Sequence, residues 1–412
     1  MYALKEEFRT IEQLNIFKGL NKIKWCRERD KQDLVMKRLN AFFSRISHDD
    51  NPFLYNMILN EIEVSQKKTI LESKPRQLGV NLTHNCNIHC RMCFYPDSPW
   101  DIPEKTAAEI KKFLPYLQRV FWQGGEPFVS PYFKELFEKG CGNPVLRQTI
   151  ITNGLLIDEE WAKRLVSNKV TIVFSIDGIT KETYDYIRSG ARYENLIEVL
   201  NTLNKYRKAY FANNDICPYN FETIMQVTIM KYNYRQIGGF LDFAKKHGFD
   251  ALNIIPIQNV FGQENIFFHK DAEALEHLAK VLPEMQRQAR HYRIRFQNQL
   301  PQAGNLNTRL PGKGKGMNVC GKDACANNGA VLSCYWPWYS LFILFEGRVK
   351  PYGFCKNDVE WDLRDHPLQE IWNNKMMQTY RRKIIEKDNT QFCDARCVSG
   401  IITKKELGLE LK

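Results

Sequence analysis

The sequence predicts an α/β protein: a partial (β/α)6 barrel, preceded by a helical N-terminal extension and followed by a small cysteine-rich C-terminal domain. Between residues 78 and 290, six short apolar runs alternate with six amphipathic stretches of helical length, which is typical of parallel βα units. Before residue 75 the apolar residues recur at helical spacing, and after residue 318 the chain becomes irregular and rich in cysteine. Six units are three-quarters of an eight-unit barrel, and an open doubly wound sheet is the alternative.

Two breaks in the pattern place the domain boundaries. Lys74-Pro75 ends the helical extension, because the residue before a proline is pushed out of the helical region. The segment 301–318 is rich in Gly, Pro and Asn and is predicted to be a linker. We therefore expect three domains, at residues 1–75, 76–300 and 301–412.

The elements of the barrel follow in order. The predicted strands are 78–84, 118–122, 149–154, 170–178, 223–230 and 251–257. The predicted helices are 102–114, 130–140, 158–166, 194–206, 234–248 and 270–288. Asp101 and Glu104 have the spacing of a capping box at the start of the first helix. In the C-terminal domain, residues 341–353 are predicted to form a hairpin with Glu346-Gly347 at its turn.

Composition narrows the class of protein. Hydrophobic residues make up 43% of the 412 residues, enough for a sizeable core. The N-terminus is too charged for a secretory signal, and the run Trp338–Phe345 is far shorter than the ~20 residues that span a bilayer. We expect a cytoplasmic protein that does not bind a membrane. The net charge of +12 favours anionic partners, but without a nucleic-acid motif or a basic tract we expect a solvated basic surface and no nucleic-acid binding.

The twelve cysteines point to metal binding or catalysis, since a disulfide framework is not expected in a reducing cytosol. Three lie together early in the chain, and six fall in the last quarter. The remaining three are isolated and are expected to be small buried apolar residues: Cys26, Cys141 and Cys217.

The early group, CNIHCRMC, follows the first strand and spaces Cys86, Cys90 and Cys93 as CxxxCxxC. Iron–sulfur clusters usually take four thiolates, so three thiolates on a cubane would leave one iron open to an external ligand. The alternative is a zinc site completed by His84 or His89. Structural zinc sites more often use paired CxxC units, and the chain has no matching pair.

Three further motifs end predicted strands, where the active sites of barrels are built. QGGEP at Gln123–Pro127 follows the second strand; its glycines would let backbone approach a ligand, and Glu126 would accept a hydrogen bond from an ammonium. Taken alone, this stretch is better explained as an ordinary turn between a strand and a helix. Thr152-Asn153 ends the third strand, and Ser175 to Asp177 ends the fourth.

These motifs together resemble the signature of the radical S-adenosylmethionine (SAM) superfamily. The resemblance implies that Cys86, Cys90 and Cys93 hold a 4Fe–4S cluster whose open iron chelates the amino and carboxylate groups of SAM. It also implies that an electron from the cluster cleaves the sulfonium, and that the resulting 5′-deoxyadenosyl radical abstracts a substrate hydrogen. The cofactor supplies this chemistry, and the protein supplies placement.

The same resemblance assigns SAM contacts. GGEP would meet the methionyl amine, and Ser175 and Asp177 would serve the ribose or methionyl part. Arg188 matches an arginine that pairs with the methionyl carboxylate; the alternative is a cation at a helix C-terminus. Met92 stands where an aromatic side chain often lies beside adenine, and methionine can pack there too. The implied SAM-binding residues are Gly124, Gly125, Glu126, Pro127, Thr152, Asn153, Ser175, Asp177, Arg188 and Met92.

Late in the chain, Cys334 is followed by Trp336-Pro337-Trp338, Gly347 and Cys355, and Cys393 and Cys397 are spaced as CxxxC. This order resembles the C-terminal SPASM extension of the superfamily. The sequence lacks cysteine at Ile384 and Lys387, where a full SPASM block carries it, so the supply suits one auxiliary 4Fe–4S cluster. The ligands that the resemblance implies are Cys334, Cys355, Cys393 and Cys397. Cys320 and Cys325 are spare; they could replace a ligand, donate a hydrogen to substrate or be structural. A zinc-stapled tail is the alternative for the group.

Two classes of function remain. The first is an enzyme that uses a carbon-centred radical to oxidise, epimerise or crosslink a peptide or a small, anionic sugar-type substrate, with a flavodoxin or ferredoxin as electron donor. The second is a non-catalytic iron–sulfur protein for electron transfer or binding. Three cysteines at the signature spacing together with GGEP favour the enzyme.

Overall fold

The computed structural model describes residues 51–95, 98–213, 221–301, 334–344, 347–353 and 363–386, with the single residues 355, 388 and 392. It divides into two compact units. The first comprises Met1–Gly79, Pro103–Val120 and Lys313–Lys412, and the second comprises Val80–Ile102 and Phe121–Gly312. These units divide the chain differently from the three predicted domains, whose boundaries stay a prediction.

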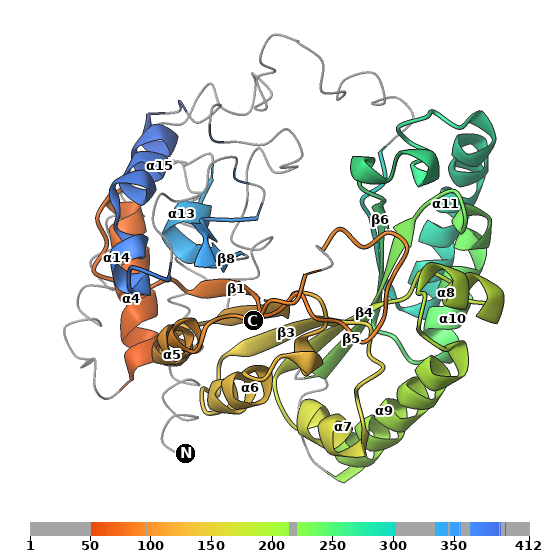
Figure 1. Ribbon diagram of the computed structural model, residues 1–412, viewed down its shortest axis with the longest axis horizontal. Coiled ribbons are helices and arrows are strands. Elements are labelled where there is room, and N and C mark those ends of the chain that lie inside the picture. The colour runs from red at the N-terminus through yellow and green to blue at the C-terminus, as the bar shows by residue number, and fades with distance from the viewer. Residues whose placement is uncertain are drawn as a thin grey trace. The chain divides into compact units, whose positions relative to one another are not determined.

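The second unit is built on a curved parallel sheet (Figure 1). Its strands are β1 (Gln77–Asn81), β2 (Arg119–Gln123), β3 (Arg147–Thr152), β4 (Val170–Ser175), β5 (Phe221–Ile229), β6 (Ala251–Pro256) and β7 (Arg295–Asn298), of which β1 and β2 begin in the first unit. They lie in the order β7-β6-β5-β4-β3-β2-β1, and the pairs from β3 to β7 are parallel. A doubly wound sheet would reverse its order at a switch point. The sequential order therefore confirms an unclosed partial barrel and excludes the doubly wound alternative.

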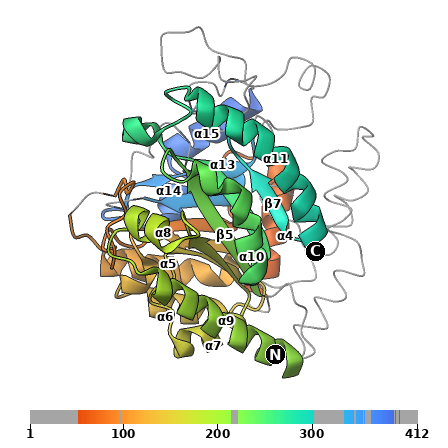
Figure 2. The same ribbon diagram turned by 90° about the vertical axis from the view of Figure 1, so that its right-hand side faces the viewer.

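Helices cover one side of this sheet (Figures 1 and 2). They are α6 (Phe133–Cys141), α7 (Glu159–Val166), α8 (Lys181–Ile187), α9 (Tyr193–Asn213), α10 (Phe240–Lys246) and α11 (Ala272–Tyr292), with the 3-10 turns η2 (Pro127–Val129), η4 (Tyr234–Gly239) and η5 (Asn259–Glu264). Local signals start them: Asp158 caps α7 by accepting a hydrogen bond from the N–H of Trp161 at 2.8 Å.

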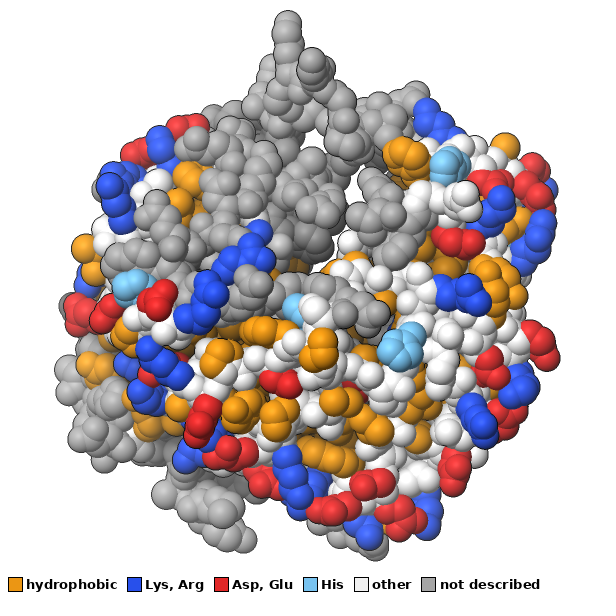
Figure 3. Space-filling view, viewed as in Figure 1, with side chains coloured by type: hydrophobic (Ala, Val, Ile, Leu, Met, Phe, Trp, Pro, Cys, Tyr) orange, Lys and Arg blue, Asp and Glu red, His pale blue; other side chains and the backbone are white. Residues whose placement is uncertain are grey.

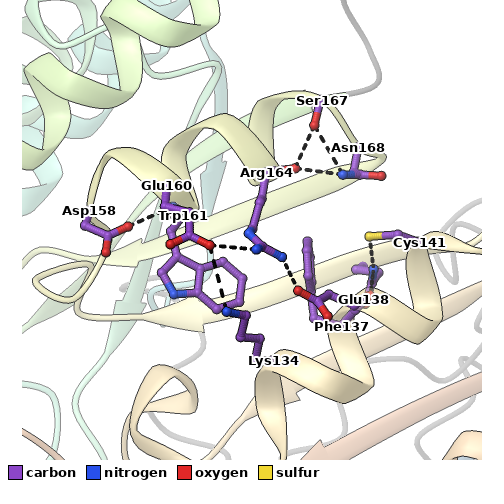
Figure 4. Close-up of polar contacts among 11 residues, drawn as sticks. Lys134, Phe137, Glu138, Cys141, Asp158, Glu160, Trp161, Arg164, Ser167 and Asn168 are labelled. Atoms are coloured by element: carbon purple, nitrogen blue, oxygen red, sulfur yellow. Dashed lines mark hydrogen bonds and ion pairs between the residues drawn. The ribbon is translucent and has the colours of Figure 1, made fainter.

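Helices α6 and α7 show how the outer layer is held (Figure 4). The indole of Trp161 packs against Phe137 of α6, with ring centroids 5.5 Å apart. It also stacks on Phe133 of the same helix, with ring centroids 5.6 Å apart. Around it, Arg164 bridges Glu160 of its own helix and Glu138 of α6. Exposed ion pairs of this kind contribute about 0–1 kcal/mol each, whereas an aromatic pair contributes about 0.5–1.5 kcal/mol beyond the area that it buries. The aromatic contacts therefore stabilise the packing of the two helices more than the ion pairs do.

The strand register brings the strand ends together. Thr152 of β3 lies opposite Phe174 of β4, and Ser175 lies opposite Gln226 of β5. Because the strands are parallel and in sequence, the segments that follow them gather at one edge of the sheet.

The first unit contains α4 (Pro52–Ser65), α5 (Glu104–Phe113), the 3-10 turn η1 (Leu114–Tyr116), α13 (Trp336–Tyr339), β8 (Ser340–Ile343), β9 (Val349–Lys350), α14 (Leu368–Trp372) and α15 (Lys375–Ile385). Strands β8 and β9 are antiparallel, and Gly347 between them has φ +81°, which confirms the predicted hairpin. The core of the unit holds a buried ion pair between Arg76 and Glu61, with N and O 2.6 Å apart. Arg381 is also fully buried and donates to three backbone carbonyls, those of Thr69, Pro337 and Trp372.

Two details differ from the sequence predictions. The capping box is wrong, because α5 begins after Pro103 without a side-chain cap and Asp101 instead accepts a hydrogen bond from Asn85 at 2.8 Å. Strand β7 was not predicted, because its residues are mostly exposed and give no apolar run. Most of the predicted N-terminal extension, residues 1–50, lies outside the described residues, as do Cys26 and Cys217.

On the face seen in Figure 3, the charged side chains of the described residues are of both signs. Lysine and arginine side chains alternate with aspartate and glutamate around the described rim in Figure 3, so this face carries no continuous basic tract. Among the described helices, none is long and apolar enough to cross a membrane.

Candidate active site

The loop that carries Cys86, Cys90 and Cys93 follows β1 and is held against the C-terminal end of α8 and the residues just after it. The N–H of His89 donates to the carbonyl of Ser189 at 2.7 Å, and the N–H of Arg91 donates to that of Ile187 at 3.0 Å. The Arg91 guanidinium also lies 4.0 Å from the Tyr186 ring centroid. Two main-chain bonds and a cation–π contact therefore fix a loop that has no regular structure of its own.

The thiols of this loop lie close enough that the charge of one affects the pKa of another. Burial, together with the neighbouring charges of Glu126, Cys90 and Cys93, raises the pKa of Cys86 to about 11. Burial also raises the pKa of Cys90, against the opposing effect of Arg188. Three thiolates in this place would repel one another, so the donor set suits a cationic centre that stabilises their charge.

No set of three Cys, His, Asp or Glu side chains among the described residues is arranged as a metal site. The zinc alternative gains nothing from the histidines. The His84 ring packs on Trp100 with centroids 5.1 Å apart, and His89 is exposed.

The glycines after β2 pack against the start of the cysteine loop. A Cβ on Gly124 would lie 2.5 Å from the carbonyl oxygen of Thr83, and one on Gly125 would lie 2.3 Å from that of Asn85. The N–H of Gly125 donates to the Thr83 carbonyl at 2.7 Å, and that of Glu126 donates to the Asn85 carbonyl at 2.9 Å. GGEP therefore brings backbone close to the chain's own segment before Cys86, a packing need that the sequence motif did not reveal.

Glu126 is fully buried and organises the end of β3. Its carboxylate accepts hydrogen bonds from the Thr152 hydroxyl at 2.7 Å, the Asn153 N–H at 2.8 Å and the Phe128 N–H at 3.4 Å. Burial raises its pKa to about 7, although these hydrogen bonds oppose the rise. An ionised carboxylate has about four lone-pair sites, so one stays open for a further donor.

Asn153 links this carboxylate to the cysteine loop. Its side-chain nitrogen is 2.8 Å from Oδ1 of Asn87 and 3.8 Å from the sulfur of Cys86. The chain Glu126–Asn153–Cys86 thus joins the ends of β2 and β3 to the first thiol. Asn87 is a residue that sequence reasoning missed; an asparagine directly after the first cysteine was the available signal.

Asp177 and Arg188 form a buried pair beside the second thiol. Asp177 is fully buried, and its carboxylate lies 2.5 Å from a terminal nitrogen of Arg188. The other terminal nitrogen of Arg188 is 3.4 Å from the sulfur of Cys90. Burial would lower the pKa of Arg188, but Asp177 and Cys90 raise it above its ordinary value. Arg188 follows the last residue of α8, so the helix-end alternative also describes its position.

The remaining predicted residues complete the edge. Ser175 ends β4 and is half-buried, and Pro127 is buried at the start of η2. Met92 packs against a buried apolar cluster of Ile187, Met230 and Ile257.

The site fits SAM on one further observation. The Nε of Arg188 is buried and has no hydrogen-bond partner among the described residues. A buried donor without a partner is costly, and a carboxylate bound there would satisfy it. Three thiols, an acceptor with an open position and an unsatisfied guanidinium N–H together suit a cluster that carries an amino acid.

Comparison with known families agrees with this geometry. Residues 80–227 match the radical SAM superfamily, and residues 334–398 match the SPASM iron–sulfur cluster-binding domain.

Residues 80–227 are a radical SAM domain.

The relatives of this chain carry names of several functions. Mycofactocin maturase MftC of Mycobacterium ulcerans is 30% identical over 180 residues, which are 42% of this chain and 45% of the maturase. An AdoMet-dependent heme synthase of Methanosarcina barkeri is 26% identical over 325 residues, 74% of this chain and 84% of the synthase. The match thus spans less than half of the maturase.

The fold resembles Streptococcus suis SuiB bound to its precursor peptide SuiA, with a TM-score of 0.54 at 16% identity over 82% of this chain and 79% of SuiB. The cofactors that the radical SAM and SPASM matches imply are a 4Fe–4S cluster with SAM and auxiliary iron–sulfur.

The SPASM cysteines are described only in part. Cys334 lies two residues before α13, and the N–H of Cys355 donates to the carbonyl of Tyr352 at 3.0 Å. Cys320, Cys325, Cys393 and Cys397 lie outside the described residues. Cys141 is half-buried on α6, where its sulfur accepts from the side chain of Gln148 at 3.3 Å.

The packing of GGEP gives a testable prediction. We expect Gly125→Ala to reduce the iron bound by the radical SAM domain and to lower the Tm, because its Cβ would clash with the backbone of residues 84 and 85 just before Cys86. Overpacking costs about 1–3 kcal/mol. Gly262→Ala is the matched control, since nothing lies within 4 Å of a Cβ at that position. Equal iron contents in the two purified, reconstituted variants would refute this account of the glycines.

Proposed function

We propose that this chain reductively cleaves SAM and uses the radical to abstract a hydrogen atom from a peptide substrate. The observation that carries the proposal is the link between Glu126 and Cys86 through Asn153, since it joins the GGEP segment to the cysteine loop in one hydrogen-bonded unit. If a cluster and SAM are bound here, the reduced cluster would supply one electron to the sulfonium, and one carbon–sulfur bond of SAM would break to give methionine and the 5′-deoxyadenosyl radical.

The residues of the chain have distinct parts in this proposal. Cys86, Cys90 and Cys93 would ligate three irons and leave the fourth for SAM. Arg188 would pair with the methionyl carboxylate through its free Nε, and Glu126 would accept from the methionyl amine at its open position. Ser175 would serve the ribose and Met92 the adenine.

The names of two similar proteins support a peptide substrate. SuiB, which shares this fold, is bound to a precursor peptide, and the first relative above is a maturase. The heme synthase, which covers more of the chain, keeps a small anionic substrate as the second candidate. An electron donor such as a flavodoxin or ferredoxin is the other partner in this proposal.

We further propose one auxiliary 4Fe–4S cluster, ligated by Cys334, Cys355, Cys393 and Cys397. A closed cube needs four thiolates, and only six cysteines follow residue 300, too few for two fully cysteine-ligated cubes. Iron analysis should therefore give about eight irons per chain. A count of about twelve would contradict the single auxiliary cluster and bring in Cys320 and Cys325; about four with zinc would favour the zinc-stapled tail.

The activity itself is tested by anaerobic reconstitution with iron and sulfide, followed by SAM and dithionite. We expect 5′-deoxyadenosine and methionine in equal amounts. A redox-active cluster that never cleaves SAM would instead support a non-catalytic electron-transfer protein. A peptide encoded beside the gene should raise the rate of SAM cleavage, and the mass of that peptide should change. If only porphyrins raised the rate, the small-molecule candidate would be favoured.

A further inference from the structure

We infer that the Asp177–Arg188 pair sets the reduction potential of the radical SAM cluster by acting on the Cys90 thiolate. This inference rests on the proposed function, because it requires a cluster at Cys86, Cys90 and Cys93. Arg188 acts here as a positioning residue. Its Nε is available to a ligand, and one of its terminal nitrogens donates to the sulfur of Cys90.

The carboxylate of the pair is held rigidly from the neighbouring strand. Oδ1 of Asp177 accepts from the N–H of Thr228 in β5 at 2.7 Å. Its main-chain carbonyl accepts from the side chain of Asn233 at 2.8 Å, and the same Asn233 nitrogen donates to the Thr228 carbonyl at 2.8 Å. Asp177 and Asn233 are both fully buried. The negative charge therefore has a fixed position.

The guanidinium is fixed just as closely. The main-chain N–H of Arg188 closes α8 on the Tyr184 carbonyl at 2.8 Å. The side chain reaches Asp177 at 2.5 Å and the sulfur of Cys90 at 3.4 Å, and it is only 11% exposed. A cation so little exposed is weakly screened by solvent and salt.

The two charges of the pair should act on the cluster with opposite signs. Reduction adds a negative charge to the cluster, which a nearby cation and a hydrogen bond to a ligating sulfur both favour. The carboxylate disfavours it. Removing Arg188 leaves Asp177 uncompensated and should make reduction harder, whereas neutralising Asp177 leaves Arg188 uncompensated and should make it easier.

This sign reversal separates a charge effect from simple damage to the fold. A structural disturbance at either residue would loosen the same loop, so it would move the potential in one direction for both substitutions or leave it unmoved. In Asp177→Asn, Oδ1 still accepts from Thr228, and in Arg188→Met much of the volume stays.

The experiment is a redox titration of the reconstituted chain without SAM, followed by the electron paramagnetic resonance (EPR) signal of the cluster that is lost on replacing Cys86, Cys90 and Cys93. We expect Arg188→Met to lower the reduction equilibrium constant about tenfold, which is 59 mV for one electron, and Asp177→Asn to raise it. Arg188→Lys should stay near the native value because it keeps the charge. The exposed pair Arg287 and Glu284 supplies matched controls, Arg287→Met and Glu284→Gln, which should not shift the potential.

Shifts of the same sign in both variants, or none, would overturn the inference while leaving the proposed function intact. If Arg188→Met does not fold, Asp177→Asn and Arg188→Lys still decide: a lowered or unchanged potential in Asp177→Asn overturns the inference. A native chain with no signal that depends on Cys86, Cys90 and Cys93 would overturn the proposed function itself.

Discussion

The Cys86, Cys90, Cys93 to alanine variant is expected to form no detectable 5′-deoxyadenosine. The reason is that these thiolates are the protein ligands of the proposed cluster, and no other cysteines of the sequence have the CxxxCxxC spacing. The iron of the C-terminal cysteines should remain, so the iron content should fall by about four per chain. The product is measured by chromatography after anaerobic incubation with SAM and dithionite.

Cys141→Ala is the control for this triple variant. Cys141 lies on α6 beside Gln148, away from the loop after β1, and its loss should leave both iron content and SAM cleavage unchanged. A triple variant that still produces 5′-deoxyadenosine would show that the radical chemistry uses other ligands.

The second large effect is expected at Glu126. Glu126→Gln removes a charged acceptor and turns a donor toward the Thr152 hydroxyl or the Asn153 N–H, which the carboxylate now satisfies. A hydrogen bond to a charged group contributes roughly 1.5–3 kcal/mol, so SAM should bind about tenfold more weakly or worse. Anaerobic equilibrium dialysis with the reconstituted protein measures the Kd.

The matched control is Glu182→Gln, which changes an exposed glutamate in the first turn of α8. It should leave both the Kd for SAM and the Tm unchanged. A Glu126→Gln variant with a lowered Tm and a native Kd would mean that Glu126 supports only the end of β3, and the assigned contact with the methionyl amine would be dropped.

The fold could be predicted from the sequence because its signals are local. Strands β2, β3 and β4 are short apolar runs, and the helices between them carry apolar faces with caps such as Asp158. The failures arose where tertiary contacts decide. The spacing of Asp101 and Glu104 suits a capping box, but Asp101 accepts from Asn85 instead.

The candidate site could be predicted as a set of residues but not as a set of contacts. The three cysteines and GGEP carry their own spacing, so they are visible in one sequence. The partners of these motifs come from other elements: Arg188 meets Cys90 across 98 positions, and Asn153 meets Cys86 across 67. Spacing along the chain cannot give such pairs, which depend on the parallel strand order and the register of β3, β4 and β5.

The central claim is that SAM binds at an open iron of the cluster held by Cys86, Cys90 and Cys93. The most direct measurement is the EPR spectrum of the reduced, reconstituted chain before and after addition of SAM. We predict a reduced-cluster signal that changes shape when SAM is added and is missing from the Cys86, Cys90, Cys93 to alanine variant, while the auxiliary signal stays the same in both. A spectrum that SAM does not alter, or a SAM-sensitive signal that persists in the triple variant, would contradict the claim.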